Sequence, residues 1–174
     1  VLASNSPRRK ELLAGLDVDY EVRVLPGIDE AYPDGLSGEE IPQYISRKKA
    51  EAYEAIMQPD ELIITADTIV WTDGKVLGKP KDEADAVRML RALSGRAHRV
   101  HTGVCICRGR RAAATVETTS VHFSSIEEDD LRIYVRTPEP YDKAGAYAIQ
   151  GHAALWCAGI EGCYYNIMGL PVHR

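Results

Sequence analysis

The sequence predicts a fold of the α/β class, with helices around a mixed sheet (an α+β mixed sheet), and three observations support this. Residues 62–66 form an unbroken apolar run, which is typical of a strand buried on both faces. Apolar residues at positions 86, 89, 90 and 93 repeat with the spacing of one helix face. Asp73-Gly74 is a favoured hairpin turn between two apolar segments. Because no repeat, linker or low-complexity tract interrupts the chain, we expect residues 1–174 to form a single domain.

The remaining elements are predicted from the same patterns, in chain order. A helix is expected to begin at Pro7, and alternation then predicts a strand over residues 20–25. Further helices are predicted at residues 39–57, from 82 to a stop at Gly95, and from 127 onward, where four acids complement the helix dipole. Strands are predicted at residues 98–107 and 112–123, and short strands and turns over residues 153–172.

Composition and charge restrict the class of protein. The formal net charge of −5 argues against broad binding to nucleic acid or to an anionic membrane, so any anion is expected at a local basic site. The sequence contains no apolar run of membrane-spanning length and no recognisable signal peptide. The four cysteines lack zinc-binding spacing and are predicted to be free thiols, which fits a cytoplasmic location.

The first turn of the chain carries a candidate anion site. Ser4 and Ser6 stand between an apolar lead-in and the helix that begins at Pro7, and Arg8 and Arg9 follow in its first turn. A helix N-terminus offers unpaired N–H groups, to which the serines and arginines add hydroxyl and guanidinium donors. The pattern therefore fits a phosphate cradle without a Gly-rich loop, or equally a capped helix with solvated arginines.

Lys49 and Asp67 are charged residues in apolar patterns. Lys49 falls on the apolar stripe of the helix at residues 39–57, either as a side chain that reaches past the stripe's edge to solvent or as a cation in a cleft. Asp67 directly follows the apolar run, where an acid is costly unless it is paired or binds a metal. It is a site carboxylate or a turn-forming acid, and the hairpin that follows brings Lys79 near it.

Gln150 is a further candidate, in a segment of small residues. It stands between Ile149 and Gly151, and its amide can both donate to and accept from the edge of a base. The alternative is a polar side chain that faces solvent from a loop.

Six motifs, in order, resemble the Maf family of nucleotide pyrophosphatases, which is named for inhibition of septum formation. Together they cover almost the whole chain, and six in order are far more specific than any one of them. The motifs are Ser4-Asn5-Ser6-Pro7-Arg8-Arg9, Ala66-Asp67-Thr68, Gly78-Lys79-Pro80, Leu93-Ser94-Gly95-Arg96, His101-Thr102-Gly103-Val104 and residues 142–151 (DKAGAYAIQG).

The resemblance implies a fold similar to the inosine-triphosphate pyrophosphatases, with a long twisted mixed sheet and a cleft between two lobes. It implies hydrolysis of a nucleoside triphosphate to the monophosphate and pyrophosphate with a divalent metal, Mg²⁺ or Mn²⁺, and a homodimer is expected from the resemblance. Asp67 matches the family's catalytic base and, with Glu30, would hold the metal. Arg9, Lys49 and Lys79 match positions that line the phosphate and metal site.

The resemblance also implies a substrate class. Arg8, Thr68 and Gln150 match the set found in the subgroup that acts on dTTP and UTP. Two alternatives remain: the same chemistry on another base, such as a modified pyrimidine or methylated guanine, and a regulator of cell division that acts mainly by binding a nucleotide. A carboxylate beside a triphosphate repels the ligand unless a metal intervenes, so Asp67 favours turnover over binding alone.

Overall fold

A five-stranded sheet organises the computed structural model, which describes residues 1–174. The strands lie in the order β2-β1-β3-β4-β5, and every neighbouring pair is antiparallel. Their bounds are β1 Ile63–Thr72, β2 Lys75–Leu77, β3 Ala97–Arg108, β4 Arg111–Phe123 and β5 Cys157–Glu161. Parallel pairing is confined to isolated bridges from Leu2 to Val22 and to Ile64. The predicted α/β class is confirmed, with the hairpin at Asp73-Gly74 joining β1 to β2.

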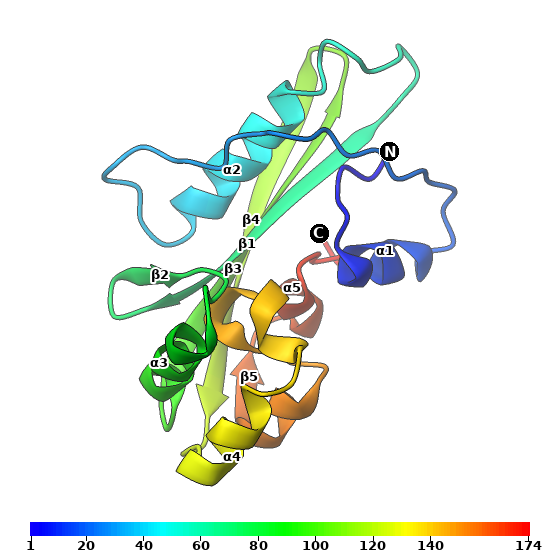
Figure 1. The fold of residues 1–174 in the computed structure, drawn as a ribbon. Helices are drawn as coiled ribbons and strands as arrows, with labels where there is room; N and C mark the ends of the chain where they lie inside the picture. The colour runs from blue at the N-terminus through cyan, green and yellow to red at the C-terminus, as the bar shows by residue number, and fades with distance from the viewer.

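Helices cover both faces of this sheet (Figure 1). The α-helices are α1 Pro7–Ala14, α2 Glu40–Glu51, α3 Glu83–Leu93, α4 Glu128–Tyr134 and α5 Tyr164–Met168, and short 3₁₀ helices lie at Glu139–Asp142, Ala144–Ala146 and His152–Trp156. Helix α2 packs alone on one face, over β1 and β3. The main core lies on the opposite face, where α1, α3, α4 and α5 pack against Ala66, Val70 and Val100 of the sheet. None of the helices combines the length and apolar character that a membrane crossing needs.

The approach of α2 to the sheet depends on Gly103 in β3. A Cβ atom on this residue would lie 2.2 Å from the carbonyl oxygen of Pro42 in α2. Only a residue without a side chain therefore permits this contact, which brings α2 close enough to place its side chains against β1.

Three predicted elements differ from the structure. The predicted strand at residues 20–25 is absent apart from the bridge at Val22, because Val22 and Val24 are exposed and Leu2 is the only residue whose backbone pairs with this segment. Helix α2 ends at Glu51 rather than near residue 57, and tighter i→i−3 bonds continue the chain. Residues 164–168 form α5 rather than strand or turn, although aromatic residues favour strands, because tertiary contacts override that preference.

Candidate active site

A cleft of about 830 Å³ opens at a free edge of β1. On this edge Leu2 bridges to Ile64, and β2 begins to pair only at Val70. Residues 65–69 of β1 therefore have β3 on one side and the cleft on the other. The other walls are the turn at residues 3–9, the loop at residues 24–32, α2, and residues 142–150 and 167–169. The volume suits a small-molecule ligand.

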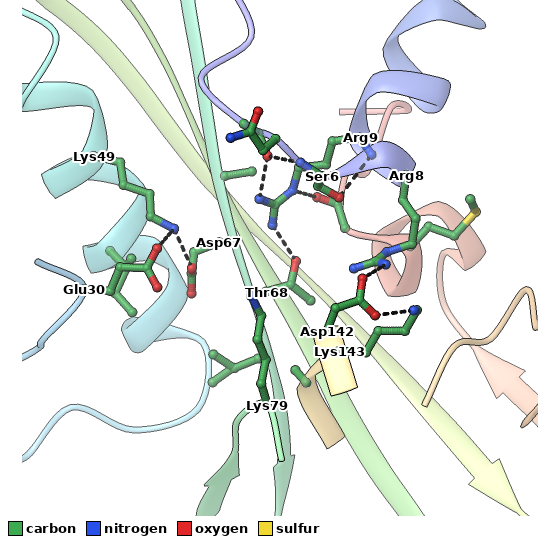
Figure 2. A pocket seen from close by; sticks show the side chains of 18 of the residues that line it. Ser6, Arg8, Arg9, Glu30, Lys49, Asp67, Thr68, Lys79, Asp142 and Lys143 are labelled. Carbon is green, nitrogen blue, oxygen red and sulfur yellow. Dashed lines mark hydrogen bonds and ion pairs between the residues drawn. The ribbon is translucent and has the colours of Figure 1, made fainter. Parts of the chain in front are cut away.

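Side-chain alternation along β1 gives the cleft two sides. Asp67 points to the face covered by α2, and Thr68 points to the face covered by α1 and α5. The cleft thus wraps around the strand edge, with the Asp67 group on one side and the Thr68 group on the other (Figure 2).

Lys49 holds two carboxylates on the α2 side. Its Nζ atom lies 2.8 Å from Oδ1 of Asp67 and 2.8 Å from Oε1 of Glu30. The side chains of Lys49 and Asp67 are each only 13% exposed, whereas that of Glu30 is 61% exposed. Of the two interpretations of Lys49, the structure supports the cation in a cleft, and the cost of burying Asp67 is offset by this ion pair.

The loop that carries Glu30 is fastened to α2 and the turn after it. The hydroxyl of Tyr53, a residue that is 1% exposed, donates to the Arg23 carbonyl at 2.8 Å and accepts from the Leu25 N–H at 3.0 Å. Lys48 pairs with Asp29 at 3.0 Å. These contacts place Glu30 next to Lys49, although the loop contains neither helix nor strand.

The carboxylates of Glu30 and Asp67 suit a hard divalent cation. Both converge on one point, which the Lys49 ammonium now occupies as a cation. No group of three or more His, Cys, Asp or Glu side chains in the structure could hold a metal. Two carboxylates fit Mg²⁺ nonetheless, because this ion commonly takes one or two protein carboxylates and completes its shell with water and substrate phosphates.

Arg9 is the most constrained cation on the other side of β1. Ser6 caps α1 by accepting from the Arg9 N–H at 3.5 Å, with Pro7 in the first helical position as predicted. The guanidinium donates to Gly169 O (2.8 Å), Thr68 Oγ1 (3.1 Å) and Ser4 Oγ (3.4 Å). Burial lowers the pKa of Arg9 from its usual value, but an arginine remains charged at neutral pH. Three of its five N–H groups are engaged, and two remain for an anion.

Arg8 belongs to a second ionic group at the same side. Its Nη1 atom lies 3.6 Å from Oδ2 of Asp142, and Lys143 donates to Oδ1 of the same carboxylate at 2.5 Å. Burial alone would raise the pKa of Asp142, but the hydrogen bond from Lys143 and the charge of Arg8 lower it overall. Asp142 and Lys143 were absent from the candidates predicted above, although their motif contributes to the family resemblance.

The structure brings every predicted site residue to this cleft. Ser4 and Ser6 use their hydroxyl oxygens as acceptors within the turn, which leaves their protons for a ligand. Lys79 is exposed just after β2, and Figure 2 shows its side chain directed toward Asp67 and Thr68. Gln150 is exposed and also lines the cleft. The lining residues are Ser4, Ser6, Arg8, Arg9, Glu30, Lys49, Asp67, Thr68, Lys79, Asp142, Lys143 and Gln150, among others.

The cleft is positive although the chain is acidic. Its lining includes five cations and three carboxylates, a local net charge of +2, against −5 for the whole chain. This agrees with the expected local basic site and fits a small polyanion.

Known proteins resemble this chain over its full length. The family model described as "Maf-like protein" matches residues 1–174. A protein of Bacteroides thetaiotaomicron named dTTP/UTP pyrophosphatase is 55% identical over 175 residues, which cover 100% of this chain and 91% of that protein. Proteins of the same name are 54% identical in Phocaeicola vulgatus and 44% identical in Pelotomaculum thermopropionicum, with the same coverage.

Among solved structures, the Staphylococcus aureus Ham1 protein is similar at a TM-score of 0.47 and 19% identity, over 70% of each chain. Likeness at this level says nothing of function, so the family rests on the sequence match and on the motif residues gathered around one cleft. The chain belongs to the Maf family.

Proposed function

We propose that this protein is a nucleoside triphosphate pyrophosphatase. It hydrolyses dTTP, UTP and modified pyrimidine nucleotides to the monophosphate and pyrophosphate. The observation that carries the proposal is the pairing of Asp67 with Lys49 at the edge of a positive cleft. Relatives with 44–55% identity bear the name dTTP/UTP pyrophosphatase, which supports the same activity in this chain.

In the proposed reaction, water attacks the α-phosphorus and the bond from that phosphorus to the bridging oxygen breaks. Asp67 accepts a proton from the water, and pyrophosphate leaves with the electrons of the broken bond. Before substrate binds, one oxygen of Asp67 accepts from Lys49, and we assign the other oxygen to the water. Arg9, Lys79 and the serines at the start of α1 stabilise the charge that develops on the leaving group.

We propose that Glu30 and Asp67 would hold Mg²⁺ or Mn²⁺ when substrate binds, because such an ion commonly takes one or two protein carboxylates. When bound, such an ion polarises the phosphoryl oxygens and neutralises part of their charge. Substrate phosphates would then attract Lys49 away from the carboxylates, which frees them for the ion.

Arg8, Thr68 and Gln150 are the residues we assign to the base. Thymine and uracil share one hydrogen-bonding edge of two carbonyl acceptors and one N–H donor, so a site that reads this edge accepts both nucleotides. The Gln150 amide and the Arg8 guanidinium supply donors, and the amide oxygen supplies an acceptor. A polar site of this kind strongly rejects a base that lacks the matching groups.

The test is to incubate the protein with each nucleoside triphosphate and Mg²⁺ or Mn²⁺, and to measure pyrophosphate and monophosphate. We expect release from dTTP and UTP, and a fall of at least about 10²-fold in Asp67→Asn. Asp73→Asn is the matched control, because this exposed acid ends the same strand in a turn and should leave the rate unchanged.

Other outcomes separate the alternatives. Release from a different nucleotide, still lost in Asp67→Asn, would keep the chemistry and reject the base preference. Tight nucleotide binding without release would instead favour the regulator of cell division. Cytoplasmic location and a homodimer remain part of the proposal.

A further inference from the structure

A line of hydrogen-bonded groups runs from the cleft across the face of the sheet that α5 covers. Arg9 contacts Thr68 Oγ1 at 3.1 Å, and Thr68 Oγ1 lies 2.9 Å from Thr102 Oγ1 on the neighbouring strand β3. Thr102 Oγ1 lies 2.9 Å from the main-chain oxygen of Asn166 in α5. Thr102 and Asn166 are both 0% exposed, so neither touches solvent or the ligand.

The proton positions along this line follow from chemistry alone. The Asn166 carbonyl carries no proton, so Thr102 must donate to it. Thr102 has only that one proton, and Thr68 must therefore donate to Thr102. Arg9 can only donate, so Thr68 accepts from it. The donor and the acceptor of each hydrogen bond in the line are therefore fixed, and the Thr68 proton points away from the cleft toward Thr102.

Asn166 is itself held on two sides. Its Nδ2 atom donates to Val100 O at 3.0 Å and to Thr119 Oγ1 at 3.0 Å, on strands β3 and β4. Thr119 in turn contacts the backbone of Cys163 at 3.0 Å, just before α5 begins. The far end of the line is therefore anchored in two central strands, and only the Arg9 end is free to meet a ligand.

We infer that Thr102 is a positioning residue, which acts through Thr68 to aim the Arg9 guanidinium at a phosphate chain. The inference rests on the proposed function, because it takes Arg9 as a phosphate-binding group. Thr102 orients the Thr68 hydroxyl, which then presents a lone pair to Arg9. Loss of the Thr102 hydroxyl leaves Thr68 free to turn its proton toward Arg9, which would repel the guanidinium.

The geometry gives a second reason to expect an effect on binding. Gly169 and Ser4 hold two other edges of the guanidinium, at 2.8 and 3.4 Å, so Thr68 is the third support. A three-point support fixes the plane of the fork and thereby the direction of its two remaining N–H groups. Two supports leave the plane free to tilt, and a bidentate contact to phosphate depends on that plane.

The experiment is a double-mutant cycle of Thr102→Val and Arg9→Gln, with dTTP kinetics and calorimetric binding of inorganic tripolyphosphate as readouts. Thr102→Val should weaken tripolyphosphate binding about tenfold and raise KM for dTTP more than it lowers kcat. In the Arg9→Gln background, it should change binding less than about twofold, because the effect passes through Arg9. Thr102→Ser keeps the hydroxyl and should bind nearly as the wild type does.

Thr115→Val on β4 is the matched control. Thr115 pairs with Val104 of β3 and its hydroxyl lies outside this line, so binding should not change. If Thr102→Val does not fold, Thr68→Val removes the next hydroxyl, which is only half-buried, and should show the same coupling to Arg9.

The inference is overturned if Thr102→Val binds tripolyphosphate as tightly as the wild type does. It is also overturned if Thr102→Val weakens binding by the same factor in the Arg9→Gln background as in the wild type, or if Thr102→Ser weakens binding as much as Thr102→Val. Wild-type protein that fails to bind tripolyphosphate also overturns it. Wild-type protein that binds tripolyphosphate but releases no pyrophosphate from dTTP rejects the proposed function instead, and the binding cycle then still decides the role of Thr102.

Discussion

Lys49 of α2 and Asp67 of β1 form an ion pair of 2.8 Å in which each side chain is only 13% exposed. The two residues come from different elements, and Gly103 permits the close approach that joins them. A pair so enclosed is costly to break on one side, because the remaining charge keeps its burial and loses its partner.

Replacement of Lys49 by Met should therefore abolish most of the activity. The two carboxylates that now share its ammonium would repel each other before substrate binds, and the substrate phosphates would lose the cation that we expect them to attract. We expect kcat/KM for dTTP to fall by about 10²-fold or more, measured as pyrophosphate release. Arg47→Met is the control, because Arg47 is exposed on the same helix and does not line the cleft, and a similar loss there would remove Lys49 from the proposed mechanism.

Glu30→Gln should weaken the use of the metal. The amide keeps the shape of Glu30 and removes the charge that attracts a divalent ion. We expect the Mg²⁺ concentration for half-maximal rate to rise about tenfold, and EDTA to stop the reaction of the wild type. Asp34→Asn alters another exposed acid of the same loop, which does not line the cleft, and should leave the Mg²⁺ dependence unchanged. An unchanged requirement in Glu30→Gln would assign the metal to other groups.

Asp142→Asn tests the support of Arg8. The Arg8–Asp142 contact of 3.6 Å involves a carboxylate that is 60% exposed, so its loss should alter global stability by only about 0–1 kcal/mol. Arg8 would nonetheless lose the charge that holds it beside the cleft, and we expect a higher KM for dTTP. Steady-state kinetics with dTTP and UTP check this, and an unchanged KM for both would exclude Asp142 from substrate binding.

Regular patterns in the sequence predicted most of the regular structure. The apolar run at residues 62–66, the Asp-Gly turn and the stripe that ends near Leu93 correspond to β1, its hairpin and α3. These elements form where local preference and tertiary burial agree. The loop at residues 20–39 and helix α5 lack such agreement, because their backbone is fixed by contacts with distant groups such as Leu2 and Thr119.

The site was predictable to a different degree. Asp67 and Lys49 could be picked out as charges in apolar patterns, whereas Glu30 came from the family resemblance alone. Nothing local distinguishes Glu30 from its neighbour Asp29, and only the fastening of the loop decides which of them meets Lys49. The line from Arg9 to Asn166 spans 157 positions of sequence and arises only from strand pairing and the placement of α5.

Acid should destabilise the protein partly through His98. This side chain is 3% exposed, and burial, with a smaller contribution from His122, lowers its pKa from 6.5 to about 4. As pH falls, the unfolded state therefore binds the proton before the folded state does. The contribution of His98 to the free energy of unfolding is complete above pH 6.5 and is lost as pH falls toward 4. The shift corresponds to about 3 kcal/mol.

Urea denaturation across this pH window measures the effect. His98→Gln keeps a partner for the Tyr147 hydroxyl, which lies 2.8 Å from His98 Nε2, and should reduce the fall in unfolding free energy between pH 6.5 and 4.5. His173→Gln removes an exposed histidine and should leave that fall as it is. If the free energy of unfolding fell equally with pH in the wild type and in His98→Gln, His98 would not be the source of the acid sensitivity.

Gly103→Ala should disturb both stability and activity, because the obstacle is backbone. The added Cβ would lie 2.2 Å from Pro42 O and 2.6 Å from Gln43 N, so α2 itself must move. We expect a loss of about 1–3 kcal/mol in the free energy of unfolding, measured with urea. Because α2 carries Lys49 to Asp67, kcat should fall even where the protein remains folded. Gly159→Ala in β5 is the control, since its Cβ would meet no atom within 4 Å, and equal behaviour of the two variants would show that α2 can shift without cost to the site.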